Sequence, residues 1–333
     1  MEKTKVGVIG LGGIAQLVHL PIISRLETVK LVSVAEINKN KLKTAGEKYS
    51  GVRPYADYKE MIVNEDLDAV IISTPTDTHE EIALACLESK KNVLIEKPVA
   101  RNFREAKEIA QAAKKVKKVA MVGMNSRFRP DTMLLRSIIN SGELGDLFYI
   151  NCSWLRRKSS AQKWFVNKNL SGGGVIIDLG IVILDLALWM MGQDQIHSVS
   201  VQKFDHTKDK IEDSAIGMIR FQDGKVINFE VSWELYSSTD SFNLTVHGTK
   251  GTACINPLRI FKKTESSHID YSPNKNSNIQ NLFRKSYENE LRHFIGAVRE
   301  GAPVISSVDE SLTRMKLLEA LYKSAEHQKE IKL

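Results

Sequence analysis

Short apolar runs alternate with longer segments of helical periodicity through the first third of the chain. Each helical segment separates two apolar runs that have the length of one buried strand. Alternation of strands and helices is typical of a parallel sheet covered by helices on both faces, so an α/β fold is predicted. Strands are expected at residues 6–9, 30–35, 52–55, 68–72, 93–95 and 119–122, and helices to about residue 26 and at 38–49, 58–63, 79–89 and 103–115.

The hydrophobic pattern changes in the second half, which is rich in predicted strands. Val231, Trp233 and Leu235 alternate with Ser232 and Glu234, so one sheet face should be apolar. Asp223-Gly224 is a hairpin-turn signal. The polar stretch 264–281 is expected to be a loop. Strands are expected at 147–154, 196–204, 213–221, 226–235, 242–247 and 252–255, and helices at 130–141, about 175–191, 287–299 and 308–326.

A glycine-rich turn follows the first predicted strand and precedes the first helix. Its sequence is Gly10-Leu11-Gly12-Gly13-Ile14-Ala15, which matches G-x-G-x-x-A. The first glycine permits a tight turn, the second lets the backbone approach a pyrophosphate, and the small third residue allows close helix–strand packing. Free N–H groups at the helix start favour an anion. Gly10, Gly12, Gly13 and Ile14 are therefore predicted to bind a dinucleotide.

Glu36 ends the second predicted strand, about 20 residues after the glycine-rich turn. A carboxylate there can accept both ribose hydroxyls of an adenosine and would repel a 2′-phosphate. This favours NAD over NADP. Asn38, Lys39 and Lys41 keep NADP open, because they could accommodate a phosphate. The alternative interpretation of Glu36 is a helix-start carboxylate.

Two further strand ends carry polar residues. Ser73-Thr74-Pro75 ends one strand and Glu96-Lys97-Pro98 ends the next. Because ligands bind beyond the carboxyl ends of parallel strands, these ends and Gly10 should open on one crevice. Lys97 would then project into that crevice, and Pro98 would stop the strand. A surface lysine followed by a turn is the other interpretation.

Two histidines lie near these strand ends. His79 follows the Ser73-Thr74-Pro75 segment and would either cap the next helix or contact the cofactor. His19 lies inside the first predicted helix and is expected to be structural. No group of histidines in the sequence has metal-ligand spacing, so no metal site is predicted.

These motifs, together with Gly172-Gly173-Gly174 and Asp178, resemble the glucose–fructose oxidoreductase / inositol dehydrogenase family (Gfo/Idh/MocA) over nearly the whole chain. The resemblance implies a Rossmann domain at residues 1–123 and, at 124–333, an α/β domain with a large, mostly antiparallel open sheet. It also implies hydride transfer at a carbinol of a sugar, cyclitol or sugar derivative. Cofactor contacts are expected from Gly10, Gly12, Gly13, Ile14, Glu36, Ser73, Thr74, Pro75, His79, Glu96, Lys97 and Asn125, and substrate contacts from Lys97, Arg127, Trp164, Lys168 and Asp178.

The chain departs from the family on the long apolar helix. The usual family pattern there is Asp-x-x-x-His, but this sequence has Asp178 followed by Val182. Helical spacing places Asp178, Val182 and Asp185 on one face. Acid–base assistance is worth about 10²–10⁴ in rate, and valine has no titratable group. Three alternatives are open: Lys97 is the base, Asp178 is the base directly or through a water, or the chain binds NAD and a sugar-like ligand without turnover. Dehydrogenase activity with Lys97 and Asp178 as catalytic residues is the favoured hypothesis.

Composition adds only broad limits. The net charge is +7, but the densest basic run, 114–118, lies where a helix should end and has no interleaved aromatic residues, so no nucleic-acid partner is expected. No uninterrupted apolar run reaches about 18 residues, and none marks a signal peptide at the start, so no membrane partner and a cytoplasmic location are expected. Cys86, Cys152 and Cys254 are far apart and should be buried reduced thiols. The resemblance implies a homodimer or homotetramer formed through the C-terminal sheet.

Overall fold

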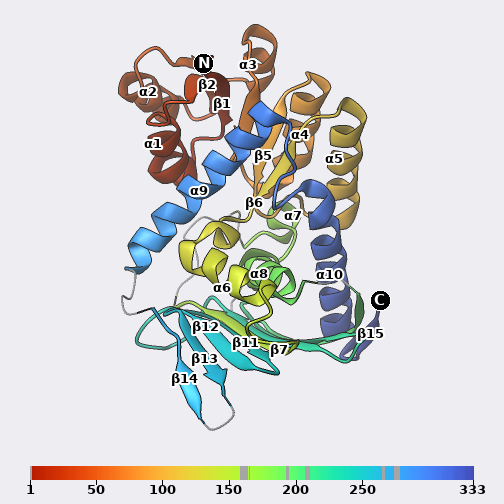
Figure 1. Cartoon of the computed structure of the whole chain (residues 1–333). Helices are drawn as coiled ribbons and strands as arrows, with labels where there is room; N and C mark the ends of the chain where they lie inside the picture. The colour runs from red at the N-terminus through yellow and green to blue at the C-terminus, as the bar shows by residue number, and fades with distance from the viewer. Residues whose placement is uncertain are drawn as a thin grey trace. The chain divides into compact units, whose positions relative to one another are not determined.

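The computed structural model describes residues 2–157, 164, 166–192, 195–206, 211–264, 267–273 and 278–333. The chain forms two compact units (Figure 1). Unit 1 contains Met1–Asn125 and Tyr287–Leu312, and unit 2 contains Ser126–Ser286 and Thr313–Leu333. This division places Tyr287–Leu312 with the N-terminal unit, whereas domains drawn along the sequence place it with the second.

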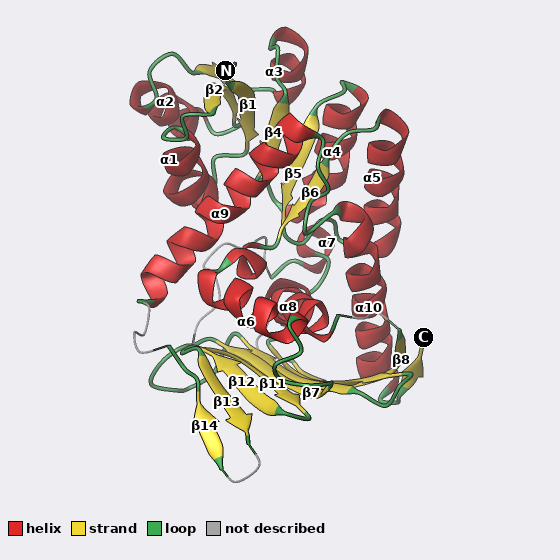
Figure 2. Ribbon diagram, in the orientation of Figure 1, coloured by secondary structure: helices red, strands yellow, loops and turns green. Residues whose placement is uncertain are grey.

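Unit 1 is built on a six-stranded parallel sheet with the order β3-β2-β1-β4-β5-β6 (Figure 2). Its central strands are apolar and buried along their length, as expected for a sheet covered on both faces. The strands are β1 Thr4–Ile9, β2 Val29–Ala35, β3 Arg53–Tyr55, β4 Ala69–Ile72, β5 Asn92–Glu96 and β6 Ala120–Gly123; the helices are η1 Ala15–His19, α1 Leu20–Ile23, α2 Lys39–Lys48, α3 Tyr58–Asn64, η2 Thr76–Thr78, α4 His79–Glu88, α5 Phe103–Val116, η3 Asn125–Phe128 (mostly in unit 2), α9 Ile279–Glu300 (from Tyr287) and the start of α10 Val308–His327.

The sheet order brings three predicted strand ends together. β1, β4 and β5 are adjacent and parallel, so Gly10, Ser73 and Lys97 follow three neighbouring strands at the same edge. The strand order reverses between β1 and β4, which is the switch point at which open α/β sheets bind ligands. The three strand ends are thus neighbours in the sheet, and the crevice on which they should open stays a prediction.

Among the described residues, unit 2 contains a nine-stranded sheet in which only β7 and β10 pair in parallel. The helices of this unit lie on one of its faces (Figure 1). Phe229, Val231 and Leu244 are buried, whereas Asn151 and Glu230 are exposed. The elements are α6 Pro130–Asn140, β7 Leu147–Leu155, α7 Lys168–Ser171, η4 Ile176–Gly180, α8 Ile181–Met191, β8 Ile196–Phe204, β9 Ser214–Phe221, β10 Val226–Ser232, β11 Ser241–Gly248, β12 Gly251–Ile255, β13 Arg259–Lys263, β14 His268–Asp270 and β15 Ile331–Lys332.

The sequence prediction was wrong for residues 264–281. Part of this stretch forms β14, which pairs with β13, and α9 begins at Ile279, before the predicted start at residue 287. Polar residues dominate both strands of this hairpin, so the apolar alternation that marks a half-buried strand is missing. The polar first turns of α9 hide its start in the same way.

The long apolar helical segment is a core element. By length and composition Lys168–Met191 is able to cross a membrane, but 89% of its most apolar window is buried inside the structure. A core helix passes the same test. The sequence criterion of an uninterrupted apolar run did not select this segment because Asp178 and Asp185 interrupt it.

Candidate active site

The glycine-rich turn is fixed by the end of β4. Gly10 has a φ of +87°, and a Cβ atom built on it would lie 2.7 Å from the Ser73 carbonyl oxygen. The Ser73 hydroxyl donates a hydrogen bond to the Gly10 carbonyl oxygen at 2.9 Å. A side chain at residue 10 would therefore separate the ends of β1 and β4. By contrast, a Cβ on Gly13 would meet no atom within 4 Å, so this part of the loop is open.

Glu36 is held against the same turn. Its Oε2 atom accepts a hydrogen bond from the Leu11 N–H at 2.7 Å, and its Oε1 atom accepts one from the Asn38 N–H at 2.9 Å. The N-cap of α2 is Asn38, whose side chain accepts hydrogen bonds from the Asn40 and Lys41 N–H groups. The carboxylate of Glu36 is thus fixed at the carboxyl end of β2 beside the glycine-rich loop, and the capping role belongs to its neighbour.

His79 joins the ends of β4 and β5. Its Nδ1 atom lies 2.9 Å from the Pro98 carbonyl oxygen, and its Nε2 atom lies 2.9 Å from the Thr74 carbonyl oxygen. The ring is buried, and this burial lowers the pKa of His79. Because both ring nitrogens contact backbone carbonyl groups, His79 acts on the crevice by holding two loops together. A direct cofactor contact remains a prediction.

Glu96 is the last residue of β5 and directly precedes Lys97. His19 Nε2 lies 2.7 Å from Glu96 Oε1, and the Lys97 backbone N–H donates to Glu96 Oε2 at 3.3 Å. His19 is fully buried, as expected for a structural residue. No sequence pattern indicated that Glu96 is the partner of His19, because the two residues are far apart in the chain and only the fold brings them together. The pair fixes the backbone from which the Lys97 side chain extends.

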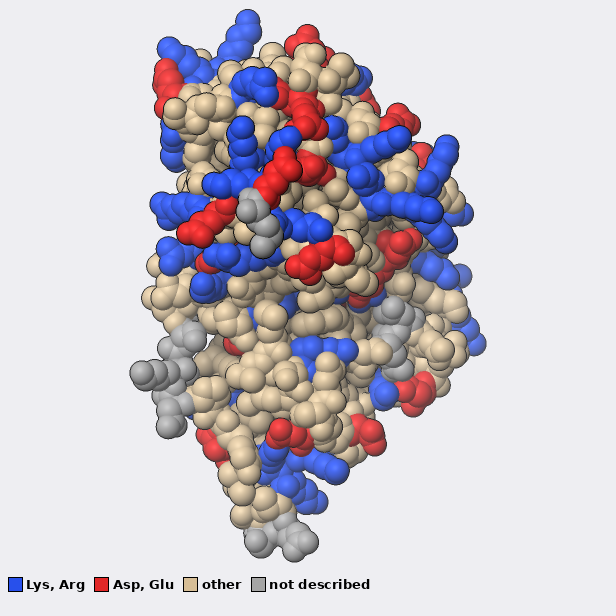
Figure 3. All heavy atoms as spheres, turned by 45° about the horizontal axis from the view of Figure 1, so that its top comes forward, with Lys and Arg blue, Asp and Glu red and all other residues tan. Residues whose placement is uncertain are grey.

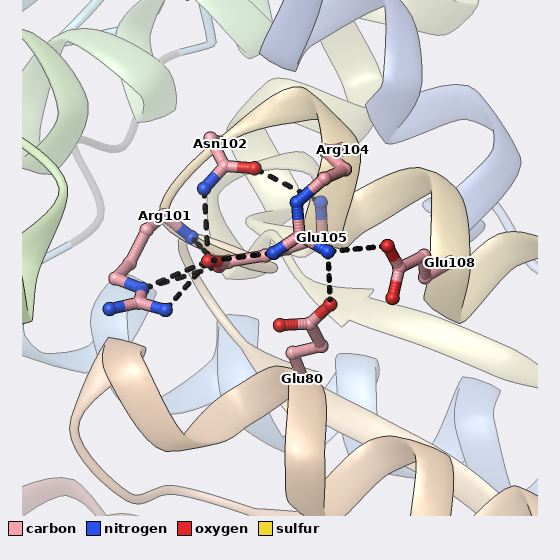
Figure 4. A network of polar contacts seen from close by, with 6 residues as sticks. All are labelled: Glu80, Arg101, Asn102, Arg104, Glu105 and Glu108. Atoms are coloured by element: carbon pink, nitrogen blue, oxygen red, sulfur yellow. Dashed lines mark hydrogen bonds and ion pairs between the residues drawn. The ribbon is translucent and has the colours of Figure 1, made fainter.

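The residues after Pro98 are held by a polar network at the start of α5 (Figure 4). Asn102 Oδ1 accepts the Glu105 N–H at 3.0 Å, while the Asn102 side-chain amide and the Arg101 N–H donate to the Glu105 carboxylate at 2.9 and 3.0 Å. This is a reciprocal capping arrangement. The loop that follows Lys97 therefore leads into a helix whose first turn is held by these hydrogen bonds. Figure 4 also shows Arg104 paired with Glu80 and Glu108.

Asp178 lies in unit 2 on the π-helical turn η4. Its Oδ2 atom accepts a hydrogen bond from Trp233 Nε1 at 3.1 Å, and its side chain is half-buried. Val182 and Asp185 are almost fully buried. Because a π turn bonds residues five apart, it disturbs the alignment expected from α-helical spacing. Of the three residues predicted to share a face, Asp178 alone reaches solvent.

A second buried carboxylate holds the start of the π turn. Glu212 accepts hydrogen bonds from the Gly174 N–H at 2.7 Å and from the Tyr322 hydroxyl at 2.7 Å. A Cβ on Gly174 would lie 2.2 Å from the Glu212 carbonyl oxygen, which explains one glycine of Gly172-Gly173-Gly174. Burial raises the pKa of Glu212. This contact of Glu212 near Asp178 could not be predicted from the sequence, because Glu212, Gly174 and Tyr322 are distant in the chain and only the fold brings them together.

Arg127 is buried in unit 2 and paired with Asp185. Its Nε atom donates to Asp185 Oδ2 at 2.7 Å, and Arg314 Nε donates to Asp185 Oδ1 at 3.1 Å. Burial alone would raise the pKa of Asp185, but the two guanidinium groups outweigh it and lower this pKa. The Arg127 guanidinium also lies over the Trp189 ring. These contacts give Arg127 a structural role, and its predicted substrate contact stays a prediction.

The other predicted site residues are less defined. Lys168 is exposed at the start of α7, Trp164 is half-buried, and Asn125 begins η3. Residues 158–163 and 165 of the predicted pocket loop lie outside the described part of the chain. Within the described residues no group of three or more His, Cys, Asp or Glu side chains could hold a metal ion. Cys86 and Cys152 are buried free thiols, whereas Cys254 is only half-buried.

Charged groups of both signs share the surface. Lys and Arg side chains lie among Asp and Glu side chains over the face shown in Figure 3. The basic run is at a helix end, as predicted: α5 ends at Val116, with Lys114 and Lys115 in its last turn. Such cations complement the helix dipole.

Comparison with known proteins assigns both parts of the chain. Residues 4–124 match the oxidoreductase family described as GFO_IDH_MocA, NAD-binding Rossmann fold, and residues 136–333 match its C-terminal alpha/beta domain. The chain belongs to this family. The resemblance noted in the sequence, the fold class and the NAD cofactor are thereby confirmed. The oxidoreductase is 28% identical to D-glucoside 3-dehydrogenase of Escherichia coli K12, covering 97% of this chain and 95% of that protein.

Two further relatives extend the comparison. Myo-inositol 2-dehydrogenase of Thermotoga maritima is 26% identical, with 99% of this chain and 98% of that protein covered. The structure of levoglucosan dehydrogenase in complex with NADH and L-sorbose superposes with a TM-score of 0.88 and 21% identity, covering 100% of this chain and 99% of that chain. At this identity the structural likeness supports the fold of the oxidoreductase only.

The residues at the strand ends fit NAD. The open, glycine-rich loop leaves backbone N–H groups able to approach a pyrophosphate. The Glu36 carboxylate is fixed where an adenosine ribose would lie in a Rossmann fold. These two features come from unit 1 alone.

Proposed function

We propose that this oxidoreductase is an NAD-dependent dehydrogenase that transfers hydride between nicotinamide and a hydroxyl-bearing carbon of a sugar, cyclitol or sugar derivative. The observation that carries the proposal is the placement of Glu36, the glycine-rich loop and Lys97 at neighbouring strand ends of an NAD-binding unit. The names of the relatives supply the substrate class, since they include glucoside, myo-inositol and scyllo-inositol dehydrogenases.

In the proposed reaction a substrate alcohol loses a hydride to NAD and a proton to the protein. Bound NAD supplies the hydride acceptor. Lys97 projects from a braced strand end and would bind the reacting oxygen and receive its proton. Asp178, held by Trp233, is the second candidate for that proton. Glu36 would hold the adenosine ribose, and the loop from Gly10 would hold the pyrophosphate.

Val182 supports a second candidate function. The family usually has a histidine four residues after the aspartate, and here that position is a buried valine. A chain without this base could bind NAD and a sugar-like ligand as a sensor or partner subunit. Catalysis is favoured by the hydrogen bonds of Glu96 to the Lys97 backbone and of Trp233 to Asp178, because they hold both candidate catalytic residues in place.

A substrate panel separates the two functions. The protein is mixed with NAD and a range of glycosides, sugars and cyclitols, and the absorbance of NADH is followed. We expect oxidation of at least one compound. Tight NAD binding without turnover of any compound would favour the binding protein.

Restoring the family histidine tests the role of position 182. Val182→His is expected to increase turnover by part of the 10²–10⁴ range that is typical of acid–base assistance. Val182→Asn, of similar polarity but without a titratable group near neutral pH, is the control. An unchanged rate in both variants would show that the missing base does not limit this enzyme.

Two coarser expectations accompany the proposal. A cytoplasmic enzyme agrees with the free cysteines. A homodimer or homotetramer would use the sheet face of unit 2 opposite the helices, where Glu230 is exposed. Light scattering of the purified protein, compared with Glu230→Lys, measures whether such an oligomer forms through that face.

A further inference from the structure

A cluster of buried ionisable groups lies behind the strand end that carries Lys97. It consists of His19 on η1, Glu96 on β5, and Tyr287 and Glu290 on α9, and all four are buried. His19 is bonded to Glu96 as described above, and the Tyr287 ring meets the His19 ring edge-on with centroids 5.7 Å apart. We call this set the buried acid cluster. His19 and Glu96 belong to the first chain segment of unit 1, and Tyr287 and Glu290 belong to the second.

Glu290 is the unusual member. It is fully buried, and among the described residues neither of its carboxyl oxygens has a hydrogen-bond partner; the same holds for His19 Nδ1. An ionised carboxylate left unpaired in the interior is very costly, so such a group keeps its proton. Burial, assisted by the charge of Glu96, raises the pKa of Glu290 well above its usual range. Glu290 is thus a neutral carboxylic acid whose proton has no fixed acceptor.

Other members of the cluster lie near Glu290. Glu290 lies one helical turn after Tyr287, which brings it to the same side of α9 as the ring on His19. Glu96 contributes to the raised pKa values of both Tyr287 and Glu290, so its carboxylate is near them. His79 of α4 is also within electrostatic reach of Glu96. The cluster therefore places the neutral acid Glu290 close to the carboxyl group of Glu96, which is bonded to the His19 imidazole.

We propose that the buried acid cluster is a proton-holding site coupled to the redox state of the bound cofactor, with Glu290 as its protonated member. The inference rests on the proposed dehydrogenase function. In that reaction the alcohol gives one hydride to NAD and one proton to the protein, leaving a carbonyl compound, NADH and a protonated group on the protein. NAD carries a positive charge on its nicotinamide ring that NADH lacks, and a positive charge beside a buried acid would weaken the binding of a proton by that acid.

The position of the cluster suits this task. Glu96 has one carboxyl oxygen on His19 and the other on the backbone N–H of Lys97. A change in the protonation of the cluster therefore alters the electrostatic environment of Lys97. The usual histidine is absent at position 182 of this chain, and unit 1 has a protonated carboxyl group next to the strand end that carries Lys97.

Infrared spectroscopy tests the inference without needing turnover. The C=O stretching band of a protonated carboxylic acid is separate from the amide bands, and ¹³C-labelling of glutamate identifies it. We expect such a band in the NAD complex of the wild-type protein. We also expect a change in this band in the NADH-minus-NAD difference spectrum. Glu290→Gln, which resembles the neutral acid in shape, should lose the band, and Glu288→Gln on the same helix should retain it.

Each outcome decides the matter. A wild-type spectrum without the band, a band that persists in Glu290→Gln, or a difference spectrum in which it does not change would overturn the inference. Oxidation of no sugar alongside a redox-dependent band would instead refute the proposed function and leave the cluster intact. Turnover without the band would refute the cluster alone.

The pH dependence of stability provides a second measurement, which also applies if Glu290→Gln folds poorly. The folded protein holds a proton on Glu290 that the unfolded chain loses above about pH 4.3, the ordinary glutamate value. The folded state then binds more protons, so this group's contribution to stability falls as pH rises from there toward the raised folded pKa. Urea unfolding across this range should show a smaller decline in Glu290→Gln than in wild type. If the free energy of unfolding declined equally with pH in the variant and the wild type, a neutral Glu290 would be contradicted.

Discussion

We expect cofactor choice to depend on Glu36. Its carboxylate is positioned by the Leu11 and Asn38 N–H groups, and hydrogen bonds to a charged group contribute about 1.5–3 kcal/mol. Glu36→Ala should therefore weaken NAD binding by about 10–100-fold and reduce the preference over NADP. Quenching of protein fluorescence by each cofactor measures this, with Glu27→Ala, an exposed residue of the same unit, as the control. Unchanged affinities for both cofactors would remove Glu36 from the ribose site.

Lys97 should affect turnover far more than cofactor binding. Lys97→Met keeps an apolar stem of similar length but removes the proton acceptor, so kcat should fall by about 10²–10⁴ while NAD affinity stays within a few-fold. Lys91→Met, a lysine at the opposite end of β5, is the matched control. A variant that loses NAD binding to the same extent as activity would assign Lys97 to the cofactor site alone.

The sequence could predict residues whose role follows from a local pattern. Gly10, Glu36 and Lys97 each follow a short apolar strand, and the carboxyl end of a parallel strand is where ligands bind. Trp233, Glu212 and Glu290 could not be assigned in this way. Trp233 contacts Asp178 and Glu212 contacts Gly174, whereas Glu290 is buried without a hydrogen-bond partner among the described residues; no local spacing encodes such an environment.

Two helices that carry site residues contain π turns, and the loop before the second depends on a glycine. A Cβ on Gly174 would overlap the Glu212 carbonyl oxygen and carboxyl group, and the carbonyl oxygen belongs to the backbone, so it cannot turn aside as a side-chain end can. Gly174→Ala should destabilise the protein by about 1–3 kcal/mol, as overpacking does, and should reduce turnover by displacing Asp178. Gly46→Ala in α2 has space and should be neutral or stabilising. Thermal unfolding compares the two; equal melting temperatures would exclude the overlap.

The helical periodicity predicted both of these helices but neither π turn. Apolar residues continue through residues 15–26 and 175–191. This pattern does not show whether a backbone hydrogen bond joins residues four apart, as in an α-helix, or five apart, as in a π turn. The extra residue in the turn changes which side chains align. The predicted common face of Asp178, Val182 and Asp185 therefore stays a prediction, whereas the helix itself is confirmed.

At the scale of the whole molecule, unit 1 is completed by a segment from the other end of the chain. The Val122 N–H donates to the Ser306 carbonyl oxygen at 2.8 Å, and the Ser306 hydroxyl donates to the Val122 carbonyl oxygen at 2.7 Å. Leu291 and Phe294 are fully buried in this unit. Burial of two such side chains contributes about 3–6 kcal/mol, a large share of the roughly 5–15 kcal/mol that stabilises a domain.

Residues 1–125 are therefore expected to be unstable without residues 287–312. A fragment of 1–125 should unfold without a cooperative transition, whereas the same fragment joined to 287–312 by a flexible Gly/Ser linker should unfold cooperatively and bind NADH. Circular dichroism during heating and NADH fluorescence measure the two properties. A shuffled 287–312 sequence in the linked fragment controls for chain length. Cooperative unfolding of 1–125 alone would show that the N-terminal segment forms the cofactor unit by itself, and that α9 contributes the buried acid cluster without being needed for the fold.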